Sequence, residues 1–252
     1  MEATAYEQFR DLEEHHWWFR GRRSVYLGLL AAHLGEERPA RALDLGCGMG
    51  GFLTGLAKLS ERAFPADIST ESLVHVHERG FNGGVMLDAY SLPYQSGSFD
   101  LICMFDTIEH IPDDGAAMRE VARILAPGGR VMVSVPAYQF LFSNNDAIAQ
   151  HQRRYTRSML AEVFESAGLE IERNTHTNVF LFPLILPAVL AIKCMEAVDP
   201  RRKDPKHTNL TWPIPGFVHD LLHRVFSAEL SLSRRFDIPV GHSIAAIAKK
   251  PQ

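Results

Sequence analysis

The sequence predicts an α/β fold in which one mostly parallel, seven-stranded sheet carries helices on both faces. Two observations predict it. Strand-like and helix-like segments alternate along most of the 252 residues, a pattern typical of parallel sheets. A glycine cluster also follows the first buried strand directly, as in many ligand-binding α/β proteins. The chain is long enough for one such domain with a complete core and one substantial insertion.

The expected elements follow one another in a regular order. Helical spacing comes first, over residues 4–34, and the loop GEERPAR ends it. Strands are expected at 41–46, 62–68, 84–89, 99–106, 130–136, 169–177 and 242–250. Helices are expected between them at 51–60, 70–79, 113–125 and 157–167. In a sheet of this type ligands bind outside the carboxyl ends of the strands, where the topology switches.

A long insertion separates the sixth strand from the seventh. It contains the apolar run VFLFPLILPAVLAI, a polar Pro-rich loop and an amphipathic helix over 217–235. The apolar run is shorter than the roughly 20 residues of a membrane-spanning helix, and two prolines interrupt it. We expect a cap over a hydrophobic substrate, lined by side chains such as Phe180 and Leu184. A homodimer contact or peripheral membrane contact is also compatible with an apolar surface of this kind.

The chain therefore divides into four parts. These are an N-terminal helical lid (1–38), a core (39–177), the insertion (178–240) and the final strand of the core (241–252).

Composition excludes several classes of protein. The formal net charge is −4, with 46% apolar and 22% charged residues, whereas nucleic-acid binders are usually basic; we expect no nucleic-acid partner. Cys47, Cys103 and Cys194 form no C-x-x-C pair, so neither a disulfide framework nor a zinc cluster is expected. The polar, acidic start MEATAYEQFRDLEEHH lacks the apolar run of a signal peptide. These features predict a cytoplasmic protein.

The glycine cluster after the first strand, ALDLGCGMGGF, fits two ligand-binding patterns. Gly46, Gly48 and Gly51 match G-x-G-x-x-G, the dinucleotide pattern. Asp44 together with Gly46, Gly48 and Gly50 matches D-x-G-x-G-x-G. Glycine permits positive φ and close approach of the backbone, so an adenosine-containing ligand is expected beside this turn. A tight strand-to-helix turn without any ligand is the alternative.

Later positions distinguish the two ligands. Asp67 ends the second strand about 20 residues after the turn and can bind the ribose hydroxyls of either one. Asp88 lies in MLDAYSLPYQSGSFDLI, which resembles the D-A-x-x-L-P and F-D-x-I pattern of S-adenosylmethionine methyltransferases; FDTIEHIPD and ILAPGGRVMVSVP follow in the same order. Over roughly residues 40–175 the chain resembles class I methyltransferases of the type 11/12 and ubiquinone-biosynthesis O-methyltransferase group. NAD-dependent oxidoreductases lack this ordered set.

The resemblance implies a Rossmann-like sheet, S-adenosylmethionine as methyl donor and S-adenosylhomocysteine as product. The donor-binding residues that it implies are Arg22, Asp44, Gly46, Cys47, Gly48, Asp67, Ile68, Asp88, Ala89 and Ile108. Asp67 and Ile68 would face the ribose and adenine, and Asp88 with Ala89 the adenine. Ile108 would face the sulfonium, with simple core packing as the alternative.

The aromatic and basic stretch HHWWFRGRR resembles the N-terminal helix with which related methyltransferases close over the donor. Its H-x-W-x-x-x-R pattern resembles the signature of that helix. We expect Arg22, rather than Arg23, to bind the donor carboxylate with two hydrogen bonds. Trp18 and Phe19 would exclude water. A solvated helix face with its aromatic residues in the core is the alternative.

Two histidines are candidates for a catalytic role. Methyl transfer is an in-line displacement, so positioning dominates, and a general base is needed only if the acceptor must lose a proton. His110 lies in TIEHIP, and His151 lies in HQRRYT, which resembles an H-x-x-R-Y-like substrate segment. Either could instead have only a structural role, as a helix cap or a loop bridge. Asp106, Glu109 and His110 resemble an E-x-x-E-H stretch for which a divalent cation has been proposed, but the same spacing begins many helices, and we expect no metal.

The sequence thus predicts methyl transfer from S-adenosylmethionine to a small, hydrophobic acceptor, with oxygen as the expected acceptor atom. The apolar insertion suggests a quinone precursor, a polyketide or another secondary metabolite. Three alternatives stay open: C- or N-methylation of a secondary metabolite, a non-catalytic S-adenosylmethionine-binding protein, and an NAD-dependent oxidoreductase.

Overall fold

The computed structural model describes residues 12–198 and 213–252. Its seven strands form one sheet in the order β3-β2-β1-β4-β5-β7-β6. The strands are β1 (Arg41–Leu45), β2 (Arg62–Asp67), β3 (Val85–Met86), β4 (Phe99–Phe105), β5 (Leu125–Pro136), β6 (Glu170–Thr177) and β7 (Ser243–Lys249). Only β7 is antiparallel to its neighbours, β5 and β6. The predicted mostly parallel seven-stranded sheet is confirmed.

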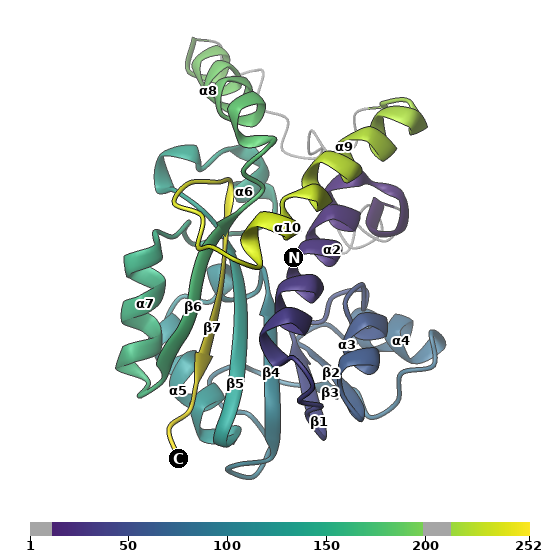
Figure 1. Cartoon of the computed structure of the whole chain (residues 1–252), viewed down its shortest axis with the longest axis vertical. Helices are drawn as coiled ribbons and strands as arrows, with labels where there is room; N and C mark the ends of the chain where they lie inside the picture. The colour runs from purple at the N-terminus through teal and green to yellow at the C-terminus, as the bar shows by residue number, and fades with distance from the viewer. Residues whose placement is uncertain (1–11, 199–212) are drawn as a thin grey trace.

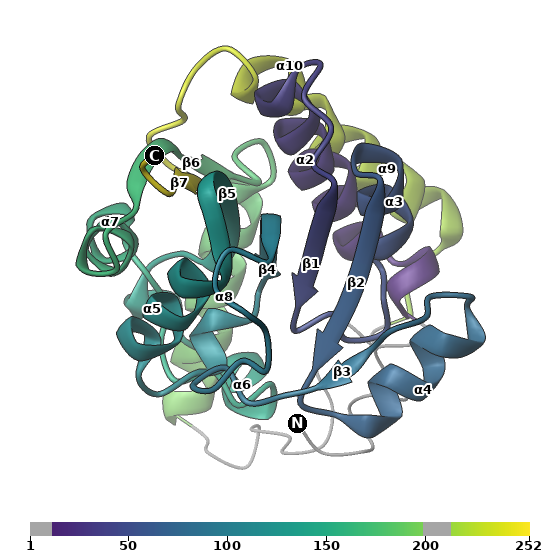
Figure 2. The ribbon, with the colours of Figure 1, turned by 90° about the horizontal axis from the view of Figure 1, so that it is seen from below.

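Helices cover both faces of the sheet (Figures 1 and 2). The helices of the described residues are α2 (Trp17–Leu34), α3 (Leu53–Leu59), α4 (Thr70–Glu78), α5 (Asp114–Ile124), α6 (Asn144–Ile148), α7 (Arg157–Ser166), α8 (Phe182–Val198), α9 (Gly216–Ala228) and α10 (Leu230–Ser233), with the short 3₁₀ turns η1 (Ile108–His110) and η2 (Gln139–Leu141). One buried apolar cluster joins α5 and α7 to the sheet, and a second joins α2, α3 and α9 to its other face.

Two expected elements are shorter than predicted. The expected helix over 4–34 is interrupted at His16, whose extended backbone and side-chain Nδ1 cap α2 by accepting the Trp18 N–H at 3.2 Å; residues 4–11 lie outside the described part. The third strand ends at Met86 because Asp88 turns the chain, its carboxylate accepting the Tyr90 N–H at 3.0 Å. The turn leaves Asp88 beyond the strand.

The insertion rises above the carboxyl ends of the parallel strands. Figure 1 shows α8 above this edge and α9 beside α2. The expected helix over 217–235 is divided at Glu229, whose buried carboxylate accepts the backbone N–H groups of Asn178 (2.6 Å) and Val179 (2.7 Å). This contact fixes the α9–α10 junction to the corner between β6 and α8. Within the described ranges, no helix is long and apolar enough to cross a membrane.

Candidate functional site

A cavity of about 800 Å³ opens at the carboxyl edge of the sheet. Its wall combines the glycine loop, the end of β2, the loop after β4, the segment 143–154, the start of α2, one side of α8 and the residues that begin β7. Ligand pockets generally measure about 300–1,000 Å³. The cavity is therefore at the upper end of this range, which leaves space for a donor and an acceptor together.

The glycine loop presents its backbone to the cavity. Gly46 and Gly48 adopt φ values of 80° and 51°, a region that favours glycine. A Cβ atom on Gly46 would lie 2.3 Å from the Thr107 side chain, so this position also needs glycine for space. The N–H groups of Gly46 and Cys47 donate to the Ala66 carbonyl at 2.8 and 3.0 Å, which holds the loop against β2.

Two acidic side chains support this loop. The Asp67 carboxylate accepts the N–H groups of Gly48 (2.8 Å) and Ser69 (2.9 Å), which uses two of about four lone-pair positions and leaves others for a ribose. Asp44 is buried, and its Oδ2 has no hydrogen-bond partner. Burial, and then the charge of Asp67, raise the pKa of Asp44 to about 8. An unpartnered buried oxygen beside a cavity fits a site completed by a ligand or water.

The predicted adenine side also lines the cavity, but Ile108, which was predicted to face the sulfonium, does not. Ile68, Asp88 and Ala89 all contribute to its wall, and Ile68 is 73% exposed, which suits contact with a flat ring system. Ile108 is fully buried in the apolar cluster beneath and does not line the cavity, because the η1 turn directs it into the core. For Ile108, core packing is the better interpretation.

The start of α2 places both arginine candidates in the wall. Arg22 forms an ion pair with Asp106, and its guanidinium carbon lies 5.8 Å from the ring centre of Phe19. Arg23 instead donates to the backbone carbonyl of Glu13 at 2.5 Å. Trp18 and Phe19 contribute to the wall as expected. The choice of Arg22 over Arg23 as the group that binds the donor carboxylate stays a prediction.

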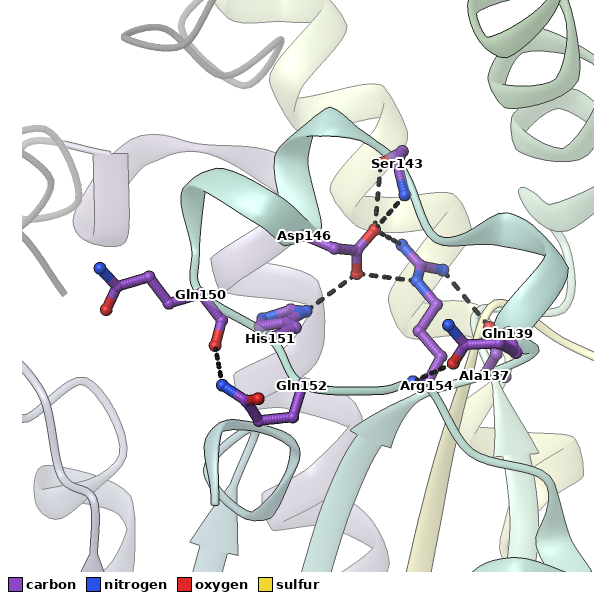
Figure 3. A network of polar contacts seen from close by, with 8 residues as sticks. All are labelled: Ala137, Gln139, Ser143, Asp146, Gln150, His151, Gln152 and Arg154. Atoms are coloured by element: carbon purple, nitrogen blue, oxygen red, sulfur yellow. Dashed lines mark hydrogen bonds and ion pairs between the residues drawn. The ribbon is translucent and has the colours of Figure 1, made fainter. Parts of the chain in front are cut away.

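A buried ionic network lies in the segment 143–154 (Figure 3). His151 Nδ1 lies 2.8 Å from Asp146 Oδ1, and Arg154 binds both carboxylate oxygens of Asp146, at 2.8 and 2.9 Å. Burial raises the pKa of Asp146, but hydrogen bonds from His151 and Arg154 outweigh it and hold the pKa below its usual range. The carboxylate therefore stays ionised and favours the tautomer that carries a proton on His151 Nδ1, so that Nε2 can accept one.

His110 and Glu109 lie beside this network. The His110 ring is perpendicular to that of His151, with the ring centres 4.7 Å apart. Burial, and then His151, lower the pKa of His110 to about 4. Glu109 is fully buried with both carboxyl oxygens unpartnered, and burial raises its pKa to about 8.

These side chains also offer a place for a cation. Ligand atoms of Glu109, His110 and His151 lie within 4.8 Å of one another. Asp106, which the sequence grouped with Glu109 and His110, is paired with Arg22 instead. A divalent ion would therefore use His151 rather than Asp106, and the expectation of no metal stays a prediction.

Sequence reasoning missed part of this wall. Asp146 and Arg154 were not identified, although an S-x-x-D helix start marks Asp146 and HQRRYT contains Arg154. His242, at the start of β7, was assigned only to a strand. The apolar side of the wall comes from one face of α8, with Ile185, Ala188, Val189 and Ile192.

Comparison with known proteins agrees with this geometry. A family model described as a methyltransferase domain matches residues 18–174. One relative, named as a probable S-adenosylmethionine-dependent methyltransferase from Mycolicibacterium smegmatis, is 29% identical over 64% of this chain and 62% of its own length. A ubiquinone biosynthesis O-methyltransferase from Xanthomonas oryzae pv. oryzae is 33% identical over 44% of this chain and 48% of its own length. The matches thus span about half to three-fifths of these relatives.

Solved structures share the fold at low sequence identity. A Haemonchus contortus phosphoethanolamine N-methyltransferase in complex with S-adenosylhomocysteine has a TM-score of 0.56 and 20% identity over 98% of this chain and 60% of that chain. The [4+2]-cyclase SpnF has a TM-score of 0.57 and 20% identity over 90% of this chain and 80% of that chain. Since a cyclase shares the fold, these likenesses establish the architecture alone.

Proposed function

We propose a function that starts from the family of this chain, which belongs to the methyltransferase family whose model it matches. In this proposal the protein transfers a methyl group from S-adenosylmethionine to an oxygen of a small, hydrophobic acceptor. One observation carries the proposal. A single cavity joins a glycine loop and acidic strand end, suited to the donor, to a histidine–carboxylate pair beside an apolar helix.

The donor would lie against the β1–β2 side of the cavity. The residues that fit it are the backbone of Gly46, Cys47 and Gly48, with Asp67 for the ribose and Ile68 for the adenine. Bound there, S-adenosylmethionine supplies an electrophilic methyl group on a sulfonium. The guanidinium of Arg22, already in the wall, would bind the carboxylate end.

His151 would act as general base on the other side. Asp146 would accept a hydrogen bond from Nδ1–H and hold the ring in place, so that Nε2 can take the proton of an acceptor hydroxyl. Asp146 also stabilises the imidazolium that results, and Arg154 keeps Asp146 ionised. His110, kept neutral by burial, would line the same position and is the second candidate for the base. A positioned general base supports oxygen as the acceptor atom, because a hydroxyl must lose its proton on methylation. The names of several relatives, which are O-methyltransferases, support the same atom.

The apolar wall supports a hydrophobic acceptor. Ile185, Val189 and Ile192 from α8 line the same cavity as His151, together with Trp17 and Trp18 from α2. Burial of an apolar group there would contribute about 25 cal/mol per Å² to binding. The exposed apolar residues of the same helix, including Leu184 and Leu190, could also form a homodimer contact or a peripheral membrane contact.

The test is a search for the methylated product. The full chain is incubated with methyl-labelled S-adenosylmethionine and a panel of phenols, enols, carboxylic acids and amines, and labelled products are identified by mass spectrometry and NMR. We expect an O-methyl product from a phenol or enol with an apolar substituent. Labelling at carbon or nitrogen would contradict the oxygen assignment. Donor binding without any labelled product would favour a non-catalytic role, and binding of NAD in place of S-adenosylmethionine would overturn the proposal.

A further inference from the structure

His242 lies on the acceptor side of the cavity for a topological reason. It immediately precedes β7, the one antiparallel strand, which therefore starts at the edge where the parallel strands end. The His242 carbonyl accepts the N–H of Ala137, the residue after β5, at 3.0 Å. Its ring lines the cavity and meets the Trp18 ring edge to face, with the ring centres 5.1 Å apart. The histidine is thus placed well away from the glycine loop along the sheet.

The imidazole of His242 is a neutral polar group in an enclosed setting. The residue is 9% exposed, and its Nδ1 is buried with no hydrogen-bond partner. Burial, and then the charge of Arg154, lower its pKa to about 3, while Asp146 acts in the opposite direction. Because Nδ1 is enclosed, Nε2 is the ring nitrogen that can meet a ligand. Because Nδ1 of this neutral ring has no hydrogen-bond partner, the ring contributes little to the stability of the fold through hydrogen bonds.

We propose that His242 is an acceptor-binding residue whose Nε2 forms a hydrogen bond with a second polar group of the acceptor, distinct from the atom that receives the methyl group. The inference rests on the proposed function, since it assigns the methylated oxygen to His151. Arg154 connects the two positions: its guanidinium binds Asp146, the partner of His151, and also donates to the Ala137 carbonyl at 3.3 Å. The N–H of Ala137 in turn donates to the His242 carbonyl. With its ring against Trp18 and α8 side chains in the wall of the same cavity, His242 selects acceptors that carry two polar groups.

The physical reason for selectivity is the cost of leaving a buried polar group unpaired. An acceptor that lacks the second polar group would bury Nε2 of His242 without a hydrogen-bond partner. Such an analogue binds much more weakly to a site that is built to form that hydrogen bond. An acceptor that carries the group satisfies Nε2 while its apolar part lies against α8.

The probes are 5-pentylresorcinol, which has two hydroxyls and an apolar chain, and 3-pentylphenol, which lacks one hydroxyl. Binding is measured by tryptophan fluorescence in the presence of S-adenosylhomocysteine, and methylation is followed separately. We expect the wild type to bind the resorcinol about tenfold more tightly than the phenol. In H242F this preference should vanish. H242Q, whose amide can occupy the position of Nε2, should keep most of it, and H242N, whose amide lies near Nδ1, should lose it.

Several results would overturn the inference. These are an unchanged preference in H242F, a preference kept by H242N but lost in H242Q, an equal loss of S-adenosylhomocysteine affinity, and failure of the wild type to bind the resorcinol. Thermal unfolding of the three variants identifies any that fail to fold, and the Gln and Asn pair still decides between the nitrogens. Probe binding that depends on His242 without methyl transfer would contradict the proposed function and leave the His242 assignment supported.

Discussion

The two sides of the cavity are built in different ways. On the β1–β2 side, the backbone of one short loop and the carboxylate of Asp67 at the next strand end form the wall, through contacts such as Gly48 N–H to Asp67 at 2.8 Å. On the β5–β7 side, the wall consists of side chains from distant segments: Asp146 and Arg154, His242 and the inner face of α8. A site made of local backbone leaves a compact motif in the sequence, whereas a site assembled by tertiary packing does not.

The charges of the two sides differ in the same way. Asp44 is buried without a cationic partner, and burial raises its pKa to about 8. Asp146 is buried as deeply but lies between His151 and Arg154, which hold its pKa below the usual range. The β1–β2 side therefore holds a buried carboxyl group with an unpartnered oxygen, and the β5–β7 side holds a carboxylate that is already paired. The first arrangement suits binding, and the second suits orienting a base.

The largest expected effect comes from a substitution that disrupts the acceptor side of the cavity alone. Replacing His151 by Ala should lower kcat by about 10²–10⁴-fold, the usual contribution of a general base, with little change in the affinity for S-adenosylmethionine. The matched control is H110A, which alters the neighbouring ring but leaves the pair of His151 and Asp146 intact and should cost less. Steady-state kinetics and donor titrations on both variants decide it. Turnover near that of the wild type from pH 6 to 9 would exclude His151 as the base.

The second prediction concerns a substitution that disrupts the donor side of the cavity. D67A should weaken binding of S-adenosylmethionine by about 1.5–3 kcal/mol, the value of a hydrogen bond to a charged group, with the acceptor KM nearly unchanged. Since Asp67 also accepts the N–H groups of Gly48 and Ser69, some loss of stability is expected as well. Calorimetric titration together with urea unfolding separates the two effects. A folded variant with wild-type donor affinity would remove Asp67 from the donor site.

The third prediction concerns pH and the anchor of the insertion. Burial raises the pKa of Glu229 from 4.5 to about 7. Between these values the unfolded chain releases a proton that the folded chain retains, so this contribution to stability is full below about pH 4.5 and is lost as pH rises through 7. The loss should be on the order of 3 kcal/mol. E229Q cannot titrate and should show a flatter profile, measured as the free energy of unfolding from pH 4.5 to 8.

Asp44 and Glu109, whose pKa values are raised in the same direction, still titrate in E229Q. The informative quantity is therefore the difference between the two profiles. Parallel profiles for E229Q and the wild type would contradict the prediction. Donor affinity should stay unchanged, because Glu229 binds the corner between β6 and α8 and does not line the cavity.

The sequence predicts the donor side better than the acceptor side, because the donor side is built from a local motif and the acceptor side from segments that meet only in the fold. The family resemblance, now confirmed by the match over residues 18–174, depends on the glycine loop and strand ends, which are local. Asp146 and His242 join the site only because β5, β7 and the segment 143–154 come together in the fold. The S-x-x-D spacing marks a helix start at Asp146 but does not show that the residue lies at the cavity. For Ile108 the sequence left a contact with the sulfonium and core packing both open, because the side chain's direction depends on the η1 turn and neighbouring residues do not reveal it.

The smallest expected effect concerns the apolar wall that α8 contributes to the acceptor side of the cavity. Phe180 and Leu184, which were expected to line the cap, do not contribute to the cavity wall, and both are exposed, at 45% and 68%. Val189 lies in the wall one helical face away. V189S should raise the acceptor KM by about fivefold, equivalent to about 1 kcal/mol of lost apolar burial, and leave donor affinity unchanged. L184S is the matched control: it should leave KM unchanged, and a change in its oligomeric mass would identify the outer face of α8 as a subunit contact. A KM that rises in L184S but not in V189S would reverse the assignment of the two faces and remove the apolar wall from the acceptor site.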